Sequence, residues 1–133
     1  MGASKLAGTT DQERPSVCLL DDDPSVVKST SRLLSSVGWN VDPFTDPVEF
    51  LQHAEICQPK VVVLDILMPV MNGLEVQKRL RSVSPGSRVI VVTSKDDPEV
   101  RQQAIEGGAS AFFVKPVDEA EFLAGIQAAF SRN

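Results

Sequence analysis

The apolar run Val61–Leu64 constrains the fold of this chain more than any other feature. Three of its four residues are β-branched, and no polar residue interrupts it. Such a run is typical of a strand buried on both faces of a parallel sheet. It ends at Asp65, and a loop with Pro69, Asn72 and Gly73 follows. Ligands of open α/β sheets bind beyond the carboxyl ends of the strands, so Asp65 is predicted to lie in a functional site.

Strands and helices are predicted to alternate along the rest of the chain. Each predicted strand precedes a segment with helical periodicity or a helix-starting Asp-Pro or Asn-Gly pair; the strands are 16–20, 39–44, 61–64, 88–92 and 111–114. This alternation predicts an α/β, flavodoxin-like doubly wound (βα)5 fold with a five-stranded parallel sheet in the order 2-1-3-4-5. Pro43 favours an edge position for the second strand. Residues 1–15 are predicted to be a flexible N-terminal tail, and residues 16–131 one folded domain.

Composition excludes several classes of function. The chain has 133 residues and a net charge of −5, which disfavours direct nucleic acid binding and attraction to membrane surfaces. No apolar stretch is long enough for membrane insertion, and no signal-peptide core is present. The two cysteines make no disulfide framework: Cys18 is expected to be a small buried hydrophobe, and Cys57 to lie at a helix end or loop. A reducing, cytoplasmic setting is therefore predicted.

Polar side chains follow four of the predicted strands. Asp21–Asp23 come after the first strand, Asp65 after the third, Thr93 after the fourth and Lys115 after the fifth. Carboxylates crowded at one sheet edge repel each other unless a cation neutralises them, and oxygen ligands without His or Cys favour Mg²⁺. A neighbouring lysine and hydroxyl suit a transferring phosphoryl group, and a carboxylate can accept that group as an aspartyl phosphate. Asp23, just before Pro24, is predicted to be a helix cap instead of a ligand.

These motifs resemble the receiver domain of bacterial two-component response regulators, which has the CheY-like fold. The similarity extends from about residue 16 to residue 131. The Phe50-Leu51 pair and the segment around Met68-Pro69 also resemble the FixJ-like subgroup. The motifs stand in the order and at the intervals usual for the family: Leu20–Pro24, Leu64–Pro69 with Asn72-Gly73, Val92–Ser94, Gly107–Ala109 and Val114–Pro116.

The resemblance implies a role for each strand-end residue. Asp65 would be the phosphoacceptor, and Asp22, Asp65 and the backbone carbonyl of Leu67 would bind Mg²⁺, with Asp21 acting through water. Thr93 and Lys115 would contact phosphoryl oxygens. Phe112 would be the switch aromatic that follows Thr93, and the bond between Lys115 and Pro116 would be cis. His53, the only histidine, is expected on a helix far from the strand ends and without a role.

The implied function is a phosphorylation-controlled signalling switch. A sensor histidine kinase or phosphotransfer protein would donate the phosphoryl group, and a downstream output domain or protein would respond. The chain would not be a turnover enzyme, and the apolar Leu67 favours slow autodephosphorylation, although Lys95 also flanks the path of the attacking water.

A homodimer could use the face formed by the helix after Asp97, the strand 111–114 and the last helix. Both a stand-alone receiver and part of a longer regulator are compatible with the sequence.

Three alternative functions fit the sequence less well. A receiver-like module that only docks, without phosphorylation, typically lacks an acidic residue or the lysine, and this chain has them all. A haloacid-dehalogenase-type phosphohydrolase needs a second aspartate two residues after the nucleophile, where Leu67 stands. A flavodoxin needs a phosphate-binding loop after the first strand, where this chain has acids.

Overall fold

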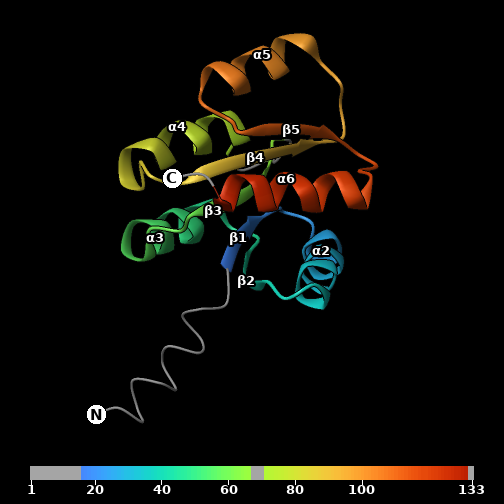
Figure 1. Cartoon of the computed structure of the whole chain (residues 1–133). Helices are drawn as coiled ribbons and strands as arrows, with labels where there is room; N and C mark the ends of the chain where they lie inside the picture. The colour runs from blue at the N-terminus through green and yellow to red at the C-terminus, as the bar shows by residue number, and fades with distance from the viewer. Residues whose placement is uncertain (1–15, 67–70, 132–133) are drawn as a thin grey trace, which may run out of the picture.

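The computed structural model describes residues 16–66 and 71–131, in which strands and helices alternate (Figure 1). All neighbouring strands pair in parallel, in the order β2-β1-β3-β4-β5, which confirms the predicted topology. The predicted N-terminal tail lies outside the described residues. The elements are β1 (Ser16–Leu20), α2 (Pro24–Ser36), β2 (Asn40–Phe44), α3 (Pro47–Cys57), β3 (Val61–Asp65), α4 (Gly73–Val83), β4 (Arg88–Thr93), α5 (Pro98–Glu106), β5 (Ala111–Val114) and α6 (Glu119–Ser131).

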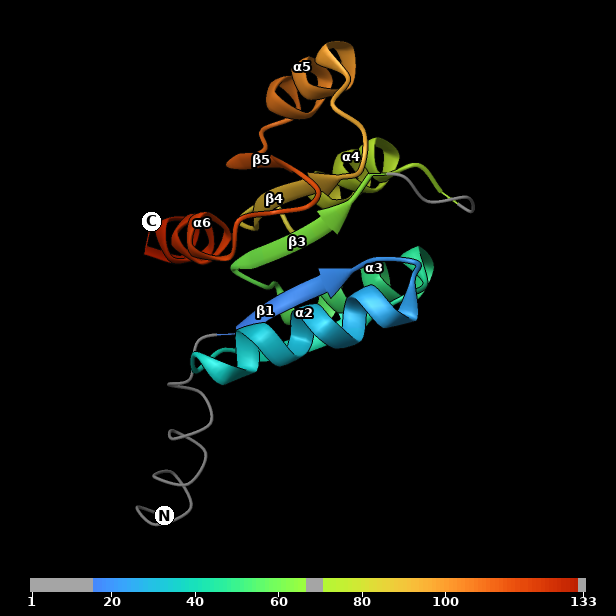
Figure 2. The same cartoon turned by 90° about the vertical axis from the view of Figure 1, so that its right-hand side faces the viewer.

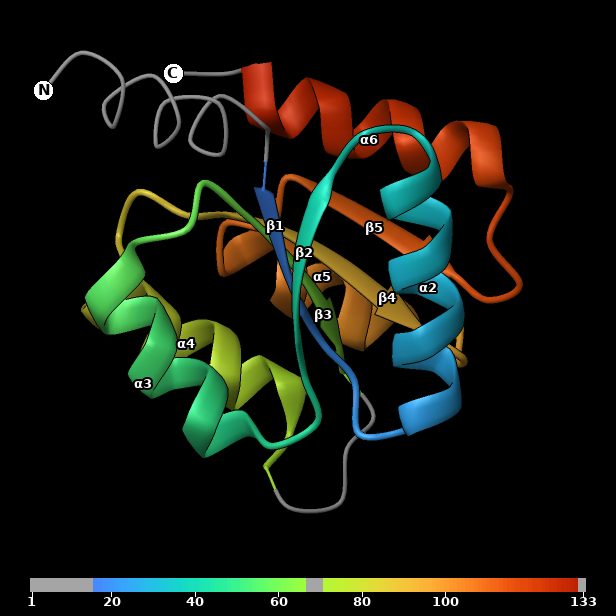
Figure 3. The same cartoon turned by 90° about the horizontal axis from the view of Figure 1, so that it is seen from below.

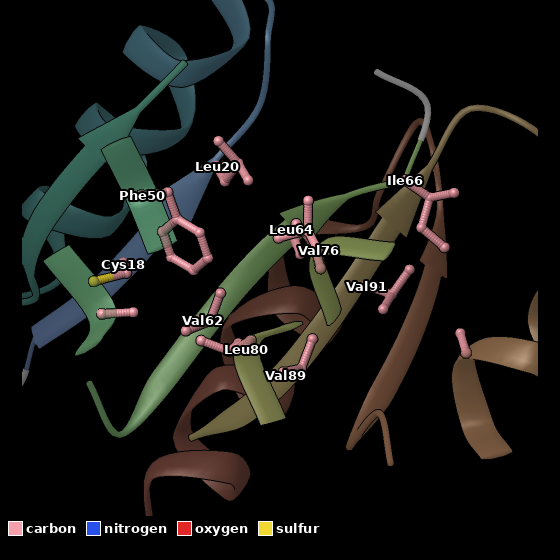
Figure 4. Packing of buried hydrophobic residues seen from close by; sticks show 12 residues of the cluster. Cys18, Leu20, Phe50, Val62, Leu64, Ile66, Val76, Leu80, Val89 and Val91 are labelled. Carbon is pink, nitrogen blue, oxygen red and sulfur yellow. The ribbon is translucent and has the colours of Figure 1, made fainter. Parts of the chain in front are cut away.

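Helices cover both faces of the sheet (Figures 2 and 3). Because side chains alternate along a strand, each central strand contributes to two separate cores. One core packs the sheet against α3, α4 and α5, and includes Leu20, Leu64 and Phe50 (Figure 4). The other packs it against α2 and α6, and includes Val63 and Ile126. β3 is buried along its whole length, as its uninterrupted apolar sequence predicted.

Polar caps begin the helices where the sequence predicted them. The side chains of Asp23, Asp46, Asn72 and Asp97 each accept a hydrogen bond from the backbone N–H two residues later. The Asp118 side chain accepts one from the N–H of Glu121. Such caps satisfy N–H groups that the first helical turn leaves without partners. Among the described residues, none of the helices combines the length and apolar character needed to cross a bilayer.

The structure corrects the predicted start of β2 and shows how Trp39 is buried. The strand begins at Asn40 instead of Trp39. Trp39, although it precedes an edge strand, is only 6% exposed. Its ring makes an edge-to-face contact with Phe130 near the end of α6, with centroids 5.3 Å apart. The C-terminal helix therefore covers this residue, which a local reading of the sequence could not anticipate. Pro43 does lie on an edge strand, since β2 pairs only with β1.

Candidate functional site

The sheet order brings two acidic segments together. β1 and β3 are neighbours, so Asp21 and Asp22, just after β1, lie beside Asp65, the last residue of β3. One carboxylate oxygen of each residue lies within 4.8 Å of the others. Asp21 and Asp65 are buried, whereas Asp22 is partly exposed. The structure thus assembles the cluster of carboxylates expected at this edge.

Lys115 joins this cluster from the loop after β5. Its Nζ donates a hydrogen bond to Oδ2 of Asp21 over 3.1 Å, and the Asp21 side chain is only 5% exposed. The other oxygen of Asp21 accepts a hydrogen bond from the backbone N–H of Asp23. Both oxygens of Asp21 are therefore engaged. Among the described residues, no lysine or backbone N–H donates a hydrogen bond to the Asp22 carboxylate. This carboxylate can therefore bind a further ligand.

Thr93 ends β4 and is 1% exposed. Its Oγ1 accepts a hydrogen bond from the backbone N–H of Lys95 at 3.2 Å, so the hydroxyl group can still donate a hydrogen bond to another acceptor. Its carbonyl oxygen accepts a hydrogen bond from the backbone N–H of Lys115 at 2.7 Å. The backbone of Thr93 therefore sets the position from which Lys115 reaches Asp21. The peptide bond between Lys115 and Pro116 is cis, as the resemblance implied.

Phe112 lies on β5, two residues before Val114, the register partner of Thr93. It pairs with Val91 of β4 and packs against the core on the side of α3, α4 and α5. Phe113 packs against the opposite core, because successive side chains of a strand point to opposite faces. The guanidinium carbon of Arg101, on α5, lies 4.8 Å from the centroid of the Phe112 ring, and Arg101 also pairs with Asp96 at 3.5 Å. A cation over a ring face is attracted by the ring quadrupole, so this contact with α5 favours the present position of Phe112.

Gly73 has a structural role that the sequence-based prediction did not include. The sequence predicts only a helix start at Gly73, but the N–H of Gly73 also donates a hydrogen bond to the carbonyl oxygen of Ile66 at 2.9 Å. A Cβ atom at this position would lie 2.4 Å from the Cα of Ile66 and 2.6 Å from the carbonyl oxygen of Asp65. The first turn of α4 therefore packs directly on the backbone of the candidate phosphoacceptor. An Asn-Gly pair at a helix start signals a cap, but not this close approach.

A pocket of about 300 Å³ lies beside the site between α2 and α6. Asp21, Asp65 and Lys115 contribute to its lining together with apolar residues such as Leu33 and Phe122. The charged groups of the site are thus bordered by an apolar wall, which lowers the local dielectric and strengthens electrostatic interactions. Of the predicted site residues, Leu67 alone lies outside the described part of the chain.

Comparison with known proteins identifies the family. The family model for the response regulator receiver domain matches residues 17–127. The response regulator protein TodT of Pseudomonas putida is 36% identical over 113 residues, which cover 85% of this chain and 50% of that protein. The probable transcriptional regulatory protein TcrX of Mycobacterium tuberculosis is 33% identical over 123 residues, covering 92% and 53%. The chain thus belongs to the response regulator receiver domain family, and it spans about half the length of these relatives.

Solved structures agree with this assignment. A CheY-like response regulator receiver domain protein from Methanospirillum hungatei superposes with a TM-score of 0.82 at 27% identity, covering 87% of this chain and 93% of that one. The BeF3-activated DrrB receiver domain superposes with a TM-score of 0.78 at 29% identity, covering 88% and 97%. The receiver fold predicted from the sequence is therefore confirmed.

Proposed function

We propose that this receiver domain works as a signalling switch whose phosphoacceptor is Asp65. The observation that carries the proposal is the meeting of three carboxylates, Lys115 and Thr93 at one edge of the sheet. The donor would be a phosphohistidine of a sensor kinase or a phosphotransfer protein, and the setting would be the cytoplasm. The responding partner would be an output domain or protein that regulates transcription, since the relative TcrX is named a probable transcriptional regulatory protein.

The donor set fits Mg²⁺. Three carboxylates share a small volume, and Lys115 pairs with one of them, Asp21. An all-oxygen site with excess negative charge favours a hard divalent cation. Asp22 and Asp65 would hold it directly and Asp21 through water, while the proposed carbonyl ligand of Leu67 lies outside the described residues. When bound, the cation would neutralise charge between Asp65 and the incoming phosphoryl group.

Phosphoryl transfer needs little from the protein beyond position and charge. A carboxylate oxygen of Asp65 attacks the phosphorus atom; a P–O bond forms, and the P–N bond to the donor imidazole breaks. The electron pair of that bond stays on the imidazole nitrogen. Lys115, now paired with Asp21, moves to a phosphoryl oxygen, and the Thr93 hydroxyl donates a hydrogen bond to another.

The change at Thr93 would reach the surface through Phe112. An inward move of the Thr93 side chain opens space beside β5 for the Phe112 ring, which must then leave Arg101. The Phe112 ring would thus have two alternative positions, one against Arg101 and one beside Thr93. Conformational switches use bistable elements of this kind. The face formed by α5, β5 and α6 would change its affinity for the output partner or for a second receiver.

The domain would act once per signal and not as a turnover enzyme. Because Leu67 is apolar and cannot orient water, the phosphorylated form should persist for minutes or longer. Loss of the phosphoryl group within seconds, without a phosphatase, would contradict this expectation.

The test is covalent modification by acetyl phosphate in the presence of Mg²⁺, followed by intact mass. Wild-type protein should gain one phosphoryl group, and Asp65→Asn should gain none. Asp23→Asn is the matched control, because it alters a neighbouring carboxylate that only caps α2, and it should be modified like the wild type. Modification that survives Asp65→Asn would refute the proposal.

A second variant separates chemistry from signalling. Lys115→Ala should still be modified, more slowly, but its spectra should not show the conformational response that wild type gives with beryllofluoride. An unchanged response would remove Lys115 from the switch.

A further inference from the structure

A second group of metal-ligating side chains lies away from the acidic cluster. Cys18 on β1 and Asp42 on β2 are register partners, so their side chains project from the same face of the sheet. His53 reaches them from α3. One ligand atom from each of these three residues lies within 4.8 Å of the others. None of them belongs to the candidate phosphorylation site.

His53 is oriented by its neighbours, and its position corrects the expectation that it lies far from the strand ends. Its ring centroid is 4.9 Å from that of Phe44, the last residue of β2. Its Nδ1 lies 3.7 Å from Sγ of Cys57, one helical turn along α3. Its Nε2 lies 3.6 Å from Oδ2 of Asp42, which is too long for a hydrogen bond.

The Nε2 atom is buried and has no hydrogen-bond partner among the described residues. A buried polar atom in this state costs free energy unless something binds it. The Cys57 sulfur suits the Nδ1–H as a weak acceptor, and this leaves the Nε2 lone pair directed to Cys18 and Asp42. Histidines that bind metals usually have this arrangement, with the second nitrogen held by a neighbouring group.

We propose that Cys18, Asp42 and His53 form a second metal site, for a borderline-soft divalent cation such as Zn²⁺. Sulfur, imidazole and carboxylate ligands together select Zn²⁺ and its neighbours over Mg²⁺. Three protein ligands leave a fourth position for water, and the Asp42 side chain, 52% exposed, gives access to solvent. Cys57 is a positioning residue that holds the imidazole.

Redox sensing is the main competing interpretation of these cysteines. Both thiols are free. Burial raises the pKa of Cys18 to about 12, with smaller contributions from Asp42 and Cys57, so the thiol is protonated and unreactive at neutral pH. A bound cation would displace that proton, which limits the affinity of the site. The raised pKa argues against redox sensing by Cys18, and the metal proposal rests on the grouping of Cys18 with Asp42 and His53.

Metal binding here would join β1, the edge strand β2 and α3. Since β1 leads directly to Asp21 and Asp22, the site would brace the strand that carries the acidic pair. A ligand that binds only the folded state raises its stability in proportion to the logarithm of ligand concentration. Zn²⁺ should therefore raise the unfolding midpoint of the whole domain.

The test uses the full chain, reduced and free of chelators, titrated with Co²⁺ and then with Zn²⁺ against a chromophoric chelator. With excess Mg²⁺ present to occupy the acidic cluster, we expect a thiolate-to-cobalt absorption band that saturates at one Co²⁺ per chain and is lost when Zn²⁺ is added. Asp65→Asn is the matched control, because it alters the acidic cluster alone, and it should bind Co²⁺ as wild type does.

The ligand variants decide the assignment. Cys18→Ala should abolish the band, and the partly exposed His53→Gln should weaken Co²⁺ binding about tenfold or more even if Cys18→Ala does not fold. Cys57→Ala should keep the band and weaken binding less than His53→Gln does. The proposal is overturned if wild type shows no thiolate band, if Cys57→Ala abolishes the band, or if His53→Gln binds as wild type does.

Discussion

Replacing Gly73 by alanine should strain the backbone at the phosphoacceptor. The added Cβ would lie 2.4 Å from the Cα of Ile66 and 2.6 Å from the carbonyl oxygen of Asp65. Both atoms belong to the backbone, so no side-chain rotation relieves the overlap. α4 must move away from the end of β3, and the hydrogen bond from Gly73 N–H to the carbonyl oxygen of Ile66 must lengthen.

The magnitude follows from two opposing effects. Overpacking of this kind costs about 1–3 kcal/mol, and an obstacle made of backbone favours the upper part of that range. Alanine has a better helix propensity than glycine, which offsets at most about 1 kcal/mol. A net loss of about 2 kcal/mol in unfolding free energy is therefore expected.

Urea unfolding measures this loss, and Gly86→Ala is the control. A Cβ at Gly86 would meet no atom within 4 Å, and no positive φ requires glycine there, so this variant should be neutral or stabilised by about 0.4–1 kcal/mol. With a urea dependence of about 2 kcal/mol per molar, the midpoint of Gly73→Ala should fall by about 1 M. The variant should also accept phosphoryl groups from acetyl phosphate more slowly. Equal midpoints for the two variants would refute the argument.

Three further predictions concern the core, a helix cap and the acidic cluster. Phe50→Ala removes a ring with no exposed surface and should cost about 3–5 kcal/mol in urea unfolding, whereas Val48→Ala, at a position 47% exposed, should change little. Hydrogen bonds from the Ser25 side chain and backbone hold the pKa of Asp23 below its ordinary value of 3.8. The stability that Asp23 contributes is thus present above that value and is lost as the pH falls through the lower folded-state pKa. The thermal midpoint of Asp23→Asn should therefore fall less between pH 7 and pH 3 than that of the wild type. An equal fall in both proteins would contradict the lowered pKa of Asp23. Mg²⁺ should raise the thermal midpoint of wild type, and Asp22→Asn should remove most of that increase; an equal increase in both would exclude Asp22 as a ligand.

Local patterns in the sequence were sufficient to predict the architecture. The uninterrupted apolar run before Asp65 required a strand covered on both faces, and alternation with capped helices left few topologies. The polar residues at the strand ends had to share one edge, because parallel strands all end on the same side. The cluster of Asp21, Asp22 and Asp65 and the participation of Lys115 followed from this geometry, and the structure places them together.

Contacts between segments distant in sequence could be decided only by the tertiary structure. The burial of Trp39 depends on the end of α6, and the need for glycine at residue 73 depends on the exact approach of α4 to β3. The grouping of Cys18, Asp42 and His53 depends on the register of β1 with β2 and on how α3 packs against the sheet. Sequence periodicity reports which face of an element is buried, but register and close approach arise from packing between elements, which no local pattern encodes.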